Sequence, residues 1–441
     1  ALLDRALAKD PDLRFTSAGE MASEFLSIFN GQTATPATIH IAKLARKHVE
    51  ELKTPKSIPP AQPSSRFRWI RVAVETLAAL LLAFVIFQFV NPGTTSDTDT
   101  PLPRDPDISV GRLRFGDFSS VMDEIQLTLN TAELPEDDHH YEAWLVSDDG
   151  ATTRKLGLVT FNAAGVGQVT LLDPDQGNFL ANFDKTIVSK ELNGTETSTP
   201  SDDVVYSSVF PPKALLPIRS LLVSHEITPD NLALIQGLWY YSGSYINISI
   251  NGYDVQGEEV LGLRQAFENG NEPTVRKRTE EIINQISGSS SELYGDHDGD
   301  GKIDNTADGF GSFPNGDHPG YVQETLLQVK LAVEAADSTP NIRTNGENVQ
   351  ICIQNMDGRL KRILELALQL KDTPFGAEME PLIAELESLG GTLIRGTDAD
   401  QDGLIEPLPG ECGADSAYEF AYNMADMPLL PGENRIPPSG K

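Results

Sequence analysis

The spacing of apolar residues divides this 441-residue chain into three kinds of sequence. Residues 72–90 form an almost unbroken apolar run, and residues 123–190 contain several segments in which apolar and polar positions alternate. From about residue 215 onward, apolar residues recur every three or four positions. In order, these patterns predict a helix of membrane-spanning character, a set of β-strands and a mostly helical region.

The apolar run 72–90 has the length and the flanking residues of a transmembrane helix. At ~1.5 Å per residue it would reach roughly 28 Å, which is about the thickness of the hydrocarbon core of a bilayer. Arg66, Arg68 and Arg71 precede the run, whereas the next basic residue after it is Arg104. Because basic residues favour the cytoplasmic side, we expect a cytoplasmic N-terminus and extracytoplasmic domains after the span. A helix buried in a soluble core is the alternative.

The alternating segments are short, and turn residues separate them. Gly150, Gly165 and Asp173-Pro174 lie between them, as is typical of turns in an antiparallel sheet. We therefore expect a small antiparallel β-sandwich over residues 108–200. The predicted strands are 123–130, 141–146, 155–161, 166–172 and 186–190.

The helical spacing predicts helices over 275–287 and near 378–389, the second ending at Gly390-Gly391, and an acidic loop follows each helix. The predicted architecture is multi-domain α+β: a helical stub, one transmembrane helix, a β-sandwich and a mostly α-helical domain with acidic loops. The expected parts are the stub 1–30, a juxtamembrane linker 31–71, the span 72–90, a spacer 91–107, the sandwich 108–200 and the helical domain 215–441.

The charge and the cysteine content limit which partners and which cellular compartment we expect for this chain. Residues 91–441 carry 23 basic and 57 acidic side chains, so this part of the chain should attract cations and is not expected to bind nucleic acid. The two cysteines, Cys352 and Cys412, both follow the predicted span. They form either one disulfide of an extracytoplasmic domain or two unrelated buried thiols.

The two acidic loops share the pattern Asp-x-Asp-x-Asp-Gly. Carboxylates at positions 1, 3 and 5 of such a loop converge on one hard cation, and the glycine at position 6 permits a sharp turn. The backbone carbonyl at position 7 and the residue at position 9 add ligands, and an apolar residue at position 8, Ile303 or Ile405, is expected to tie the loop to the core. The pattern resembles the calcium loops of EF-hand and dockerin-like proteins.

The resemblance implies weakly bound calcium as the cofactor. Position 12, which is a bidentate acid in that family, is Ala307 in the first loop and Pro409 in the second, so Asp308 or Glu411 would have to substitute. We expect an affinity on the order of 10⁻⁴–10⁻³ M. An Asp/Gly-rich surface turn without metal is the alternative. The candidate ligands are Asp296, Asp298, Asp300, Lys302, Asp304 and Asp308 in the first loop, and Asp398, Asp400, Asp402, Leu404 and Glu406 in the second.

The first thirty residues resemble the last two helices of a bacterial receptor-type Ser/Thr protein kinase domain. The resemblance rests on residues 6–11 (Ala-Leu-Ala-Lys-Asp-Pro), Arg14-Phe15, Ser17-Ala18 and Glu20-Met21. It implies that Arg14 is buried against an acidic residue of the kinase activation segment. The motifs that bind ATP and magnesium and catalyse phosphoryl transfer are not in this sequence, so ATP and magnesium belong to a kinase core outside it. A chance match of two amphipathic helices is the alternative.

Residues 110–200 resemble the extracytoplasmic domain of anti-sigma-K-type regulators. The resemblance rests on the order of Tyr141, Trp144, Gly157 and Gly165, followed by Phe183-Asp184-Lys185. It implies a domain that senses or binds something outside the cell. The glycine-rich end that this family has after its last strand is replaced here by residues 193–200, so a shared ligand does not follow from it.

These patterns indicate a membrane-anchored, single-pass signalling receptor whose extracytoplasmic part binds calcium and an unknown ligand. Phosphorylation would be carried out by the kinase core, so whether the chain itself is part of an enzyme stays open, and a homodimer is one form compatible with activation in trans. The alternatives are a non-enzymatic anti-sigma-like membrane regulator and a calcium-dependent surface interaction protein.

Overall fold

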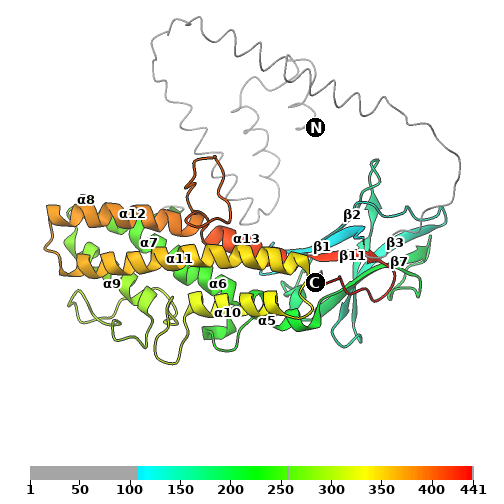
Figure 1. Cartoon of the computed structure of the whole chain (residues 1–441), viewed down its shortest axis with the longest axis horizontal. Helices are drawn as coiled ribbons and strands as arrows, with labels where there is room; N and C mark the ends of the chain where they lie inside the picture. The colour runs from blue at the N-terminus through cyan, green and yellow to red at the C-terminus, as the bar shows by residue number, and fades with distance from the viewer. Residues whose placement is uncertain (1–107, 256–257, 440–441) are drawn as a thin grey trace, which may run out of the picture. The chain divides into compact units, whose positions relative to one another are not determined.

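The computed structural model describes residues 108–255 and 258–439, which belong to one compact unit, Asp105–Lys441 (Figure 1). Within these described residues, no helix is both long enough and apolar enough to cross a membrane. The kinase-like stub 1–30, the linker 31–71, the span 72–90 and the spacer 91–107 lie outside them. Those four assignments therefore stay predictions.

The strands of the described residues form a nine-stranded antiparallel sheet and a separate two-stranded one. The order in the large sheet is β4-β3-β7-β8-β11-β1-β2-β6-β5, and β9 pairs with β10 in the small one. The strands are β1 (Gly111–Gly116), β2 (Glu124–Leu129), β3 (His139–Ser147), β4 (Thr153–Leu158), β5 (Thr160–Phe161), β6 (Gly167–Leu172), β7 (Phe183–Leu192), β8 (Val204–Val209), β9 (Tyr253–Val255), β10 (Glu258–Val260) and β11 (Met427–Pro431).

The large sheet bends almost into a barrel because one continuous segment of the chain contributes a strand to each of its two edges. β4 and β5 stand at opposite ends of the strand order, yet a single residue, Val159, separates them in sequence. The backbone N–H of Val159 donates to the carbonyl of Tyr141 in β3, while the residues after it pair with β6. The predicted antiparallel strands are therefore confirmed, but they form a near-barrel and not a sandwich of two sheets.

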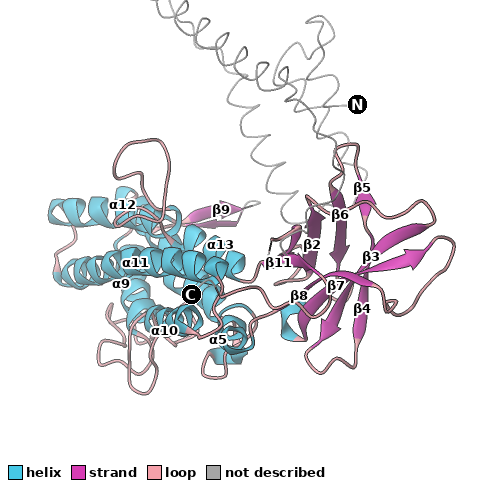
Figure 2. Ribbon diagram, turned by 45° about the vertical axis from the view of Figure 1, so that its right-hand side comes forward, coloured by secondary structure: helices cyan, strands magenta, loops and turns pink. Residues whose placement is uncertain are grey.

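The last strand of the sheet comes from the far end of the chain. β11 lies between β8 and β1, where Leu429 pairs with Gly111 and Leu430 pairs with Ser207. The helical region is thus inserted between β8 and β11, which are neighbours in the sheet (Figure 2). We expected residues 215–441 to be mostly helical, and the sequence pattern did not predict this strand.

The helices lie beside the sheet (Figure 2). Short helical turns are η3 (Phe179–Ala181), η4 (Pro229–Asn231), the π-helical turn η5 (Tyr240–Ser244) and η6 (Ala377–Met379). The longer helices are α5 (Pro212–Leu222), α6 (Leu234–Trp239), α7 (Tyr245–Asn251), α8 (Leu263–Glu268), α9 (Glu272–Ser287), α10 (Tyr321–Glu334), α11 (Pro340–Asp372), α12 (Glu380–Arg395) and α13 (Ala414–Met424).

The 33-residue helix α11 organises this region, since it packs against α9, α10, α12 and α13. It starts where the Thr339 hydroxyl accepts a hydrogen bond from the Ile342 N–H and Pro340 occupies the first turn, both favourable helix-start features. Its apolar face joins that of the sheet. Leu113 and Leu429 of the sheet and Ile353 of α11 belong to one continuous buried cluster.

The predicted helix ends were only partly correct. α9 ends at Gly288, as expected, with φ 79° at that glycine. α12 continues through Gly390 and Gly391 to Gly396, so the predicted stop at Gly390 is wrong. A Cβ at Gly390 would lie 3.0 Å from Nδ2 of Asn251, so this glycine allows α7 to approach α12 closely.

The position of β11 predicts that the sheet and the helices unfold together. Leu429→Ala removes a fully buried side chain between β8 and β1 and should lower the free energy of unfolding by about 2–5 kcal/mol. Urea denaturation followed by both tryptophan fluorescence and far-UV circular dichroism should give one coincident transition.

The matched control is Leu192→Ala, which truncates a leucine that is 55% exposed and should change stability by less than about 0.5 kcal/mol. A helical signal that survives after the fluorescence transition in the Leu429→Ala variant would contradict this coupling.

Candidate functional site

The first acidic loop brings carboxylates from the loop and from α9 together. Oxygens of Glu280, Asp296 and Asp298 lie within 4.8 Å of one another, and those of Asp298, Asp300 and Asp304 do so as well. All of these donors are carboxylate oxygens, the ligand type that hard cations such as Ca²⁺ prefer. Four of the predicted side-chain ligands therefore meet, together with one residue that the loop pattern did not predict.

That residue, Glu280, is fully buried in α9. One of its oxygens accepts the backbone N–H groups of His297 and Asp298, at 2.5 and 3.0 Å, and the other accepts the Asp304 N–H at 2.6 Å. Glu280 thus adds a buried carboxylate to the group that contains Asp296 and Asp298. The sequence feature that could have indicated Glu280 is its position four residues before Asn284, which places both side chains on one face of the helix. Asn284 also faces the loop.

Asn284 holds both ends of the first loop. Its Nδ2 donates to the carbonyls of Gly295 and Asp304, at 3.0 and 2.9 Å, and its Oδ1 accepts the Gly295 N–H. Residues four apart lie on the same face of a helix, so Glu280 and Asn284 together fix the loop to α9.

Asp304, at position 9, has one oxygen that is satisfied and one that is not. Its Oδ1 accepts a hydrogen bond from Lys277 Nζ at 2.9 Å, which raises the pKa of Lys277. Its Oδ2 is buried and has no hydrogen-bond partner among the residues that the structure describes. A buried carboxylate oxygen without a donor is costly, and a cation bound by the loop would satisfy it.

The remaining predicted residues of the first loop, Asp308 and Lys302, make other contacts. Asp308 accepts hydrogen bonds from the Tyr321 hydroxyl and the Phe310 N–H, and burial raises its pKa. It belongs to neither of the carboxylate groups above. Lys302 donates its N–H to Asp300 at 2.8 Å, while a role for its carbonyl stays a prediction.

The second loop has the same backbone shape as the first. Positions 4 and 6 have positive φ in both: 79° and 87° at Gly299 and Gly301, and 65° and 93° at Gln401 and Gly403. In each loop, the N–H at position 6 donates to the aspartate at position 1 at 2.9 Å, and the N–H at position 7 donates to the aspartate at position 5 at 2.8 Å. The N–H at position 9 donates to a buried glutamate in both cases.

The ligand set of the second loop is smaller. Oxygens of Asp398, Asp400 and Asp402 lie within 4.8 Å of one another, and Glu406 is not in this group. The buried Glu411 accepts the N–H of Glu406 at 2.9 Å. Leu404 donates its N–H to Asp402, and the role of its carbonyl as a ligand stays a prediction.

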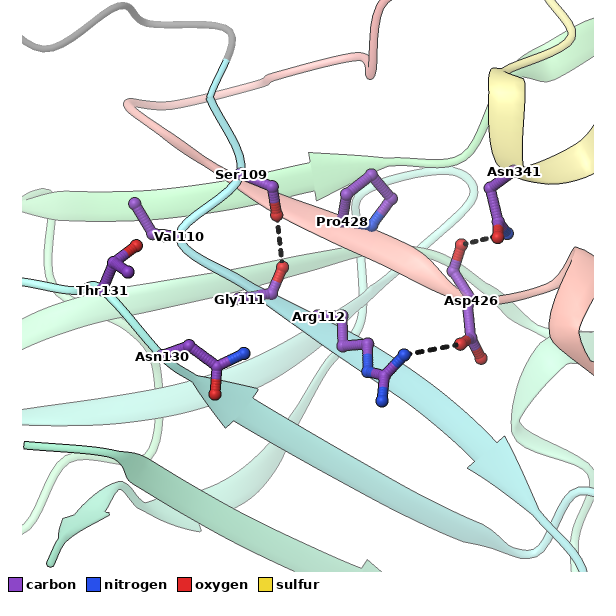
Figure 3. Close-up of a pocket in the computed structure, with 9 residues that line it drawn as sticks. All are labelled: Ser109, Val110, Gly111, Arg112, Asn130, Thr131, Asn341, Asp426 and Pro428. Atoms are coloured by element: carbon purple, nitrogen blue, oxygen red, sulfur yellow. Dashed lines mark hydrogen bonds and ion pairs between the residues drawn. The ribbon is translucent and has the colours of Figure 1, made fainter. Parts of the chain in front are cut away.

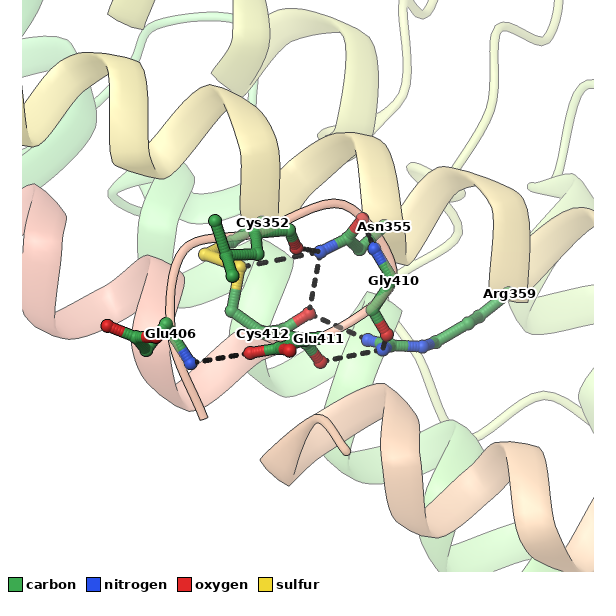
Figure 4. The surroundings of a disulfide bond; sticks show 8 residues. Cys352, Asn355, Arg359, Glu406, Gly410, Glu411 and Cys412 are labelled. Carbon is green, nitrogen blue, oxygen red and sulfur yellow. Dashed lines mark hydrogen bonds between the residues drawn. A yellow bond between two sulfur atoms is a disulfide. The ribbon is translucent and has the colours of Figure 1, made fainter. Parts of the chain in front are cut away.

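The far end of the second loop is fixed to α11 (Figure 4). Arg359 donates to the carbonyls of Gly410, Glu411 and Cys412, at 2.6–2.7 Å. Asn355, one turn earlier, donates to the Leu408 carbonyl and accepts the Gly410 N–H. As with the first loop, a pair of polar side chains four residues apart holds the backbone.

A disulfide joins Cys352 of α11 to Cys412, which confirms the first of the two alternatives for the cysteines. Disulfides persist in oxidising compartments, so the bond is consistent with an extracytoplasmic domain.

The apolar residues at position 8 do not enter the core. Ile303 is 51% exposed and Ile405 is 44% exposed, so the expectation that they tie their loops to the core is wrong. The contacts from α9 and α11 fix the loops instead, which leaves these isoleucines at the surface.

A separate cavity of about 470 Å³ lies beside β1 and the start of β11 (Figure 3). Asp426 lines it, and its carboxylate lies 3.1 Å from Arg114 Nε and 3.9 Å from Arg112 Nη1. Burial raises the pKa of Asp426 to about 6, and the two arginines only partly offset that effect.

Comparisons of the chain with protein-family models, curated proteins and solved structures gave no match.

The raised pKa of Asp426 predicts a pH-dependent loss of stability. The folded state holds the proton more tightly than the unfolded chain, so this stabilisation is complete below pH ~4 and is lost as the pH rises through 6. Across that window the wild type should lose on the order of 3 kcal/mol relative to Asp426→Asn, which does not titrate. Urea denaturation of both proteins between pH 4 and 7 measures the difference. Parallel stability profiles for the two proteins would contradict the assignment.

Proposed function

We propose that this chain is the extracytoplasmic, calcium-binding part of a membrane-anchored signalling receptor, together with its single membrane span. The observation that carries the calcium part is a pair of carboxylate groups that share Asp298: Glu280 with Asp296 and Asp298, and Asp298 with Asp300 and Asp304. Asp304 also has a buried Oδ2 without a hydrogen-bond partner among the described residues. Without a cation these carboxylates repel one another at short range. The basic side chains in ion pairs with them, Lys277 and Lys302, balance only part of that charge.

Calcium acts as a structural brace in this proposal. An ion in the first loop would join the segment 296–304 to α9 through Glu280, and α9 packs against the central helix α11. The second loop would hold an ion more weakly, because no buried carboxylate joins the group of its three aspartates.

The receptor part of the proposal rests on the order of the segments. A kinase-like sequence, a basic linker and an apolar run precede the described unit, and that unit carries a disulfide and an acidic composition. The arrangement supports a Ser/Thr protein kinase in which an external ligand acts on the near-barrel and its helices. The span would relay the signal to a cytoplasmic kinase core that binds ATP and magnesium.

A calcium-dependent surface interaction protein is the second candidate. The exposed apolar residues Leu404, Ile405 and Leu408 of the second loop favour it, at 59%, 44% and 40% exposure. In that case, binding of a partner would depend on calcium but not on the residues before the span.

Calcium should stabilise the full chain against heat. With a dissociation constant of 10⁻⁴–10⁻³ M, about 10 mM calcium adds roughly 1.4–2.7 kcal/mol, which is a rise of a few degrees in Tm. Asp298→Asn removes a charge shared by both carboxylate groups but keeps the acceptor for the Asp300 N–H, so most of the rise should disappear. Differential scanning calorimetry in calcium, magnesium and EDTA measures it.

Two matched variants serve as controls in this experiment. Asp400→Asn makes the same change in the second loop and should remove less of the rise, and Asp202→Asn, an exposed aspartate outside both loops, should remove none. Equal Tm values in calcium and EDTA for the wild type would refute the calcium proposal.

The kinase part predicts what the reading frame encodes before Ala1. About 250 codons upstream should contain a Gly-rich loop, a strand lysine, a His-Arg-Asp catalytic loop and an Asp-Phe-Gly motif. Sequencing that region tests the proposal. A start codon close to Ala1, or an upstream domain without these motifs, would favour the anti-sigma-like regulator instead.

A further inference from the structure

Two adjoining cavities lie where α13 packs against β1 and α6. Their volumes are about 350 and 290 Å³, and both are lined by Asp117, Asp415 and Tyr418. We call their combined surface the aromatic groove. It is defined by Asp117, Trp239, Tyr240, Asp415, Tyr418 and Tyr422, and neither acidic loop contributes to it.

Four aromatic rings form the walls of the aromatic groove in two pairs. Trp239 and Tyr240 meet edge to face, with centroids 4.9 Å apart, and Tyr418 and Tyr422 stack at 4.7 Å. Tyr240 is the first residue of the π-helical turn η5 and remains 43% exposed. Such turns are rare and are often found at functional sites.

The aromatic side chains hold the carboxylates of the groove in place. The hydroxyls of Tyr418 and Tyr422 donate to the two oxygens of Asp117, at 2.8 and 2.7 Å. Trp239 Nε1 donates to Asp415 Oδ1 at 2.7 Å. Burial and the charge of Asp117 raise the pKa of Tyr418, so its hydroxyl stays protonated as a donor.

The two aspartates of the groove are not neutralised by ion pairs within the described part of the chain. Within the part of the chain that the structure describes, neither Asp117 nor Asp415 is in an ion pair with a basic side chain. Arg114 lines the groove but is engaged with Asp426 and Asn423, at 3.1 and 2.8 Å. Two fixed carboxylates therefore stand beside exposed ring surface, and neither is in an ion pair with a basic side chain of the described residues.

We propose that the aromatic groove binds a small alkylammonium compound. Carboxylates supply the charge attraction, and the negative faces of aromatic rings attract an ammonium group in addition to packing against its alkyl carbons. A simple metal ion would gain little from the rings, and an anion would be repelled. The groove gives the proposed receptor a ligand site that is separate from the calcium loops.

Choline is the probe, and its uncharged isostere 3,3-dimethyl-1-butanol is the matched ligand control. Isothermal titration calorimetry on the full chain, in nonionic detergent and saturating calcium, should show choline binding at least tenfold more tightly than the alcohol. Asp415→Asn keeps the acceptor for Trp239 but removes the charge, and should weaken choline binding about tenfold or more. Tyr240→Leu should weaken it roughly two- to thirty-fold.

Asp202→Asn serves as the charge-matched protein control and should leave choline binding unchanged, and an unchanged Tm shows that each variant is folded. No heat of choline binding to the wild type up to ~10 mM overturns the proposal. So does equal affinity for choline and the alcohol, or equal weakening by Asp202→Asn and Asp415→Asn. None of these failures bears on calcium binding, which the Tm measurements in EDTA test separately.

Discussion

The pairing of β11 with β8 and β1 is the constraint on which the rest of the described structure depends. These few residues at the end of the chain fill the centre of a sheet whose other strands lie more than two hundred positions earlier. The chain segment that contains helices α5 to α13 is therefore inserted between two strands that are neighbours in the sheet. Because the buried apolar cluster also continues from the sheet into the helices, the two parts share one hydrophobic core.

This closure places polar groups at the junction between sheet and helices. Asp426 lies directly before β11 and is half-buried beside Arg112 and Arg114 of β1, and the aromatic groove lies along α13 where that helix packs against β1. Neither feature comes from residues close in sequence: Asp117 and Tyr422 are joined by a hydrogen bond across 305 positions. Long-range pairing of the strands is what brings such residues together.

The acidic loops follow a different rule, because their shape is largely local. The aspartates accept hydrogen bonds from N–H groups two to five residues later, and positive φ at positions 4 and 6 gives both loops the same turn. The chain then fixes each loop with a polar pair four residues apart on a helix, Glu280 and Asn284 for one and Asn355 and Arg359 for the other.

Local patterns in the sequence accordingly determined the antiparallel strands, the helical region, the end of α9 and the approach of Asp298, Asp300 and Asp304 to one another. Alternation, helical periodicity and loop spacing each involve residues within a few positions of one another. Only the tertiary structure decided the closure of the near-barrel at Val159, the strand β11, the carboxylate of Glu280 and the aromatic groove. Those features depend on contacts between residues far apart in sequence, and no local pattern of apolar and polar residues specifies them.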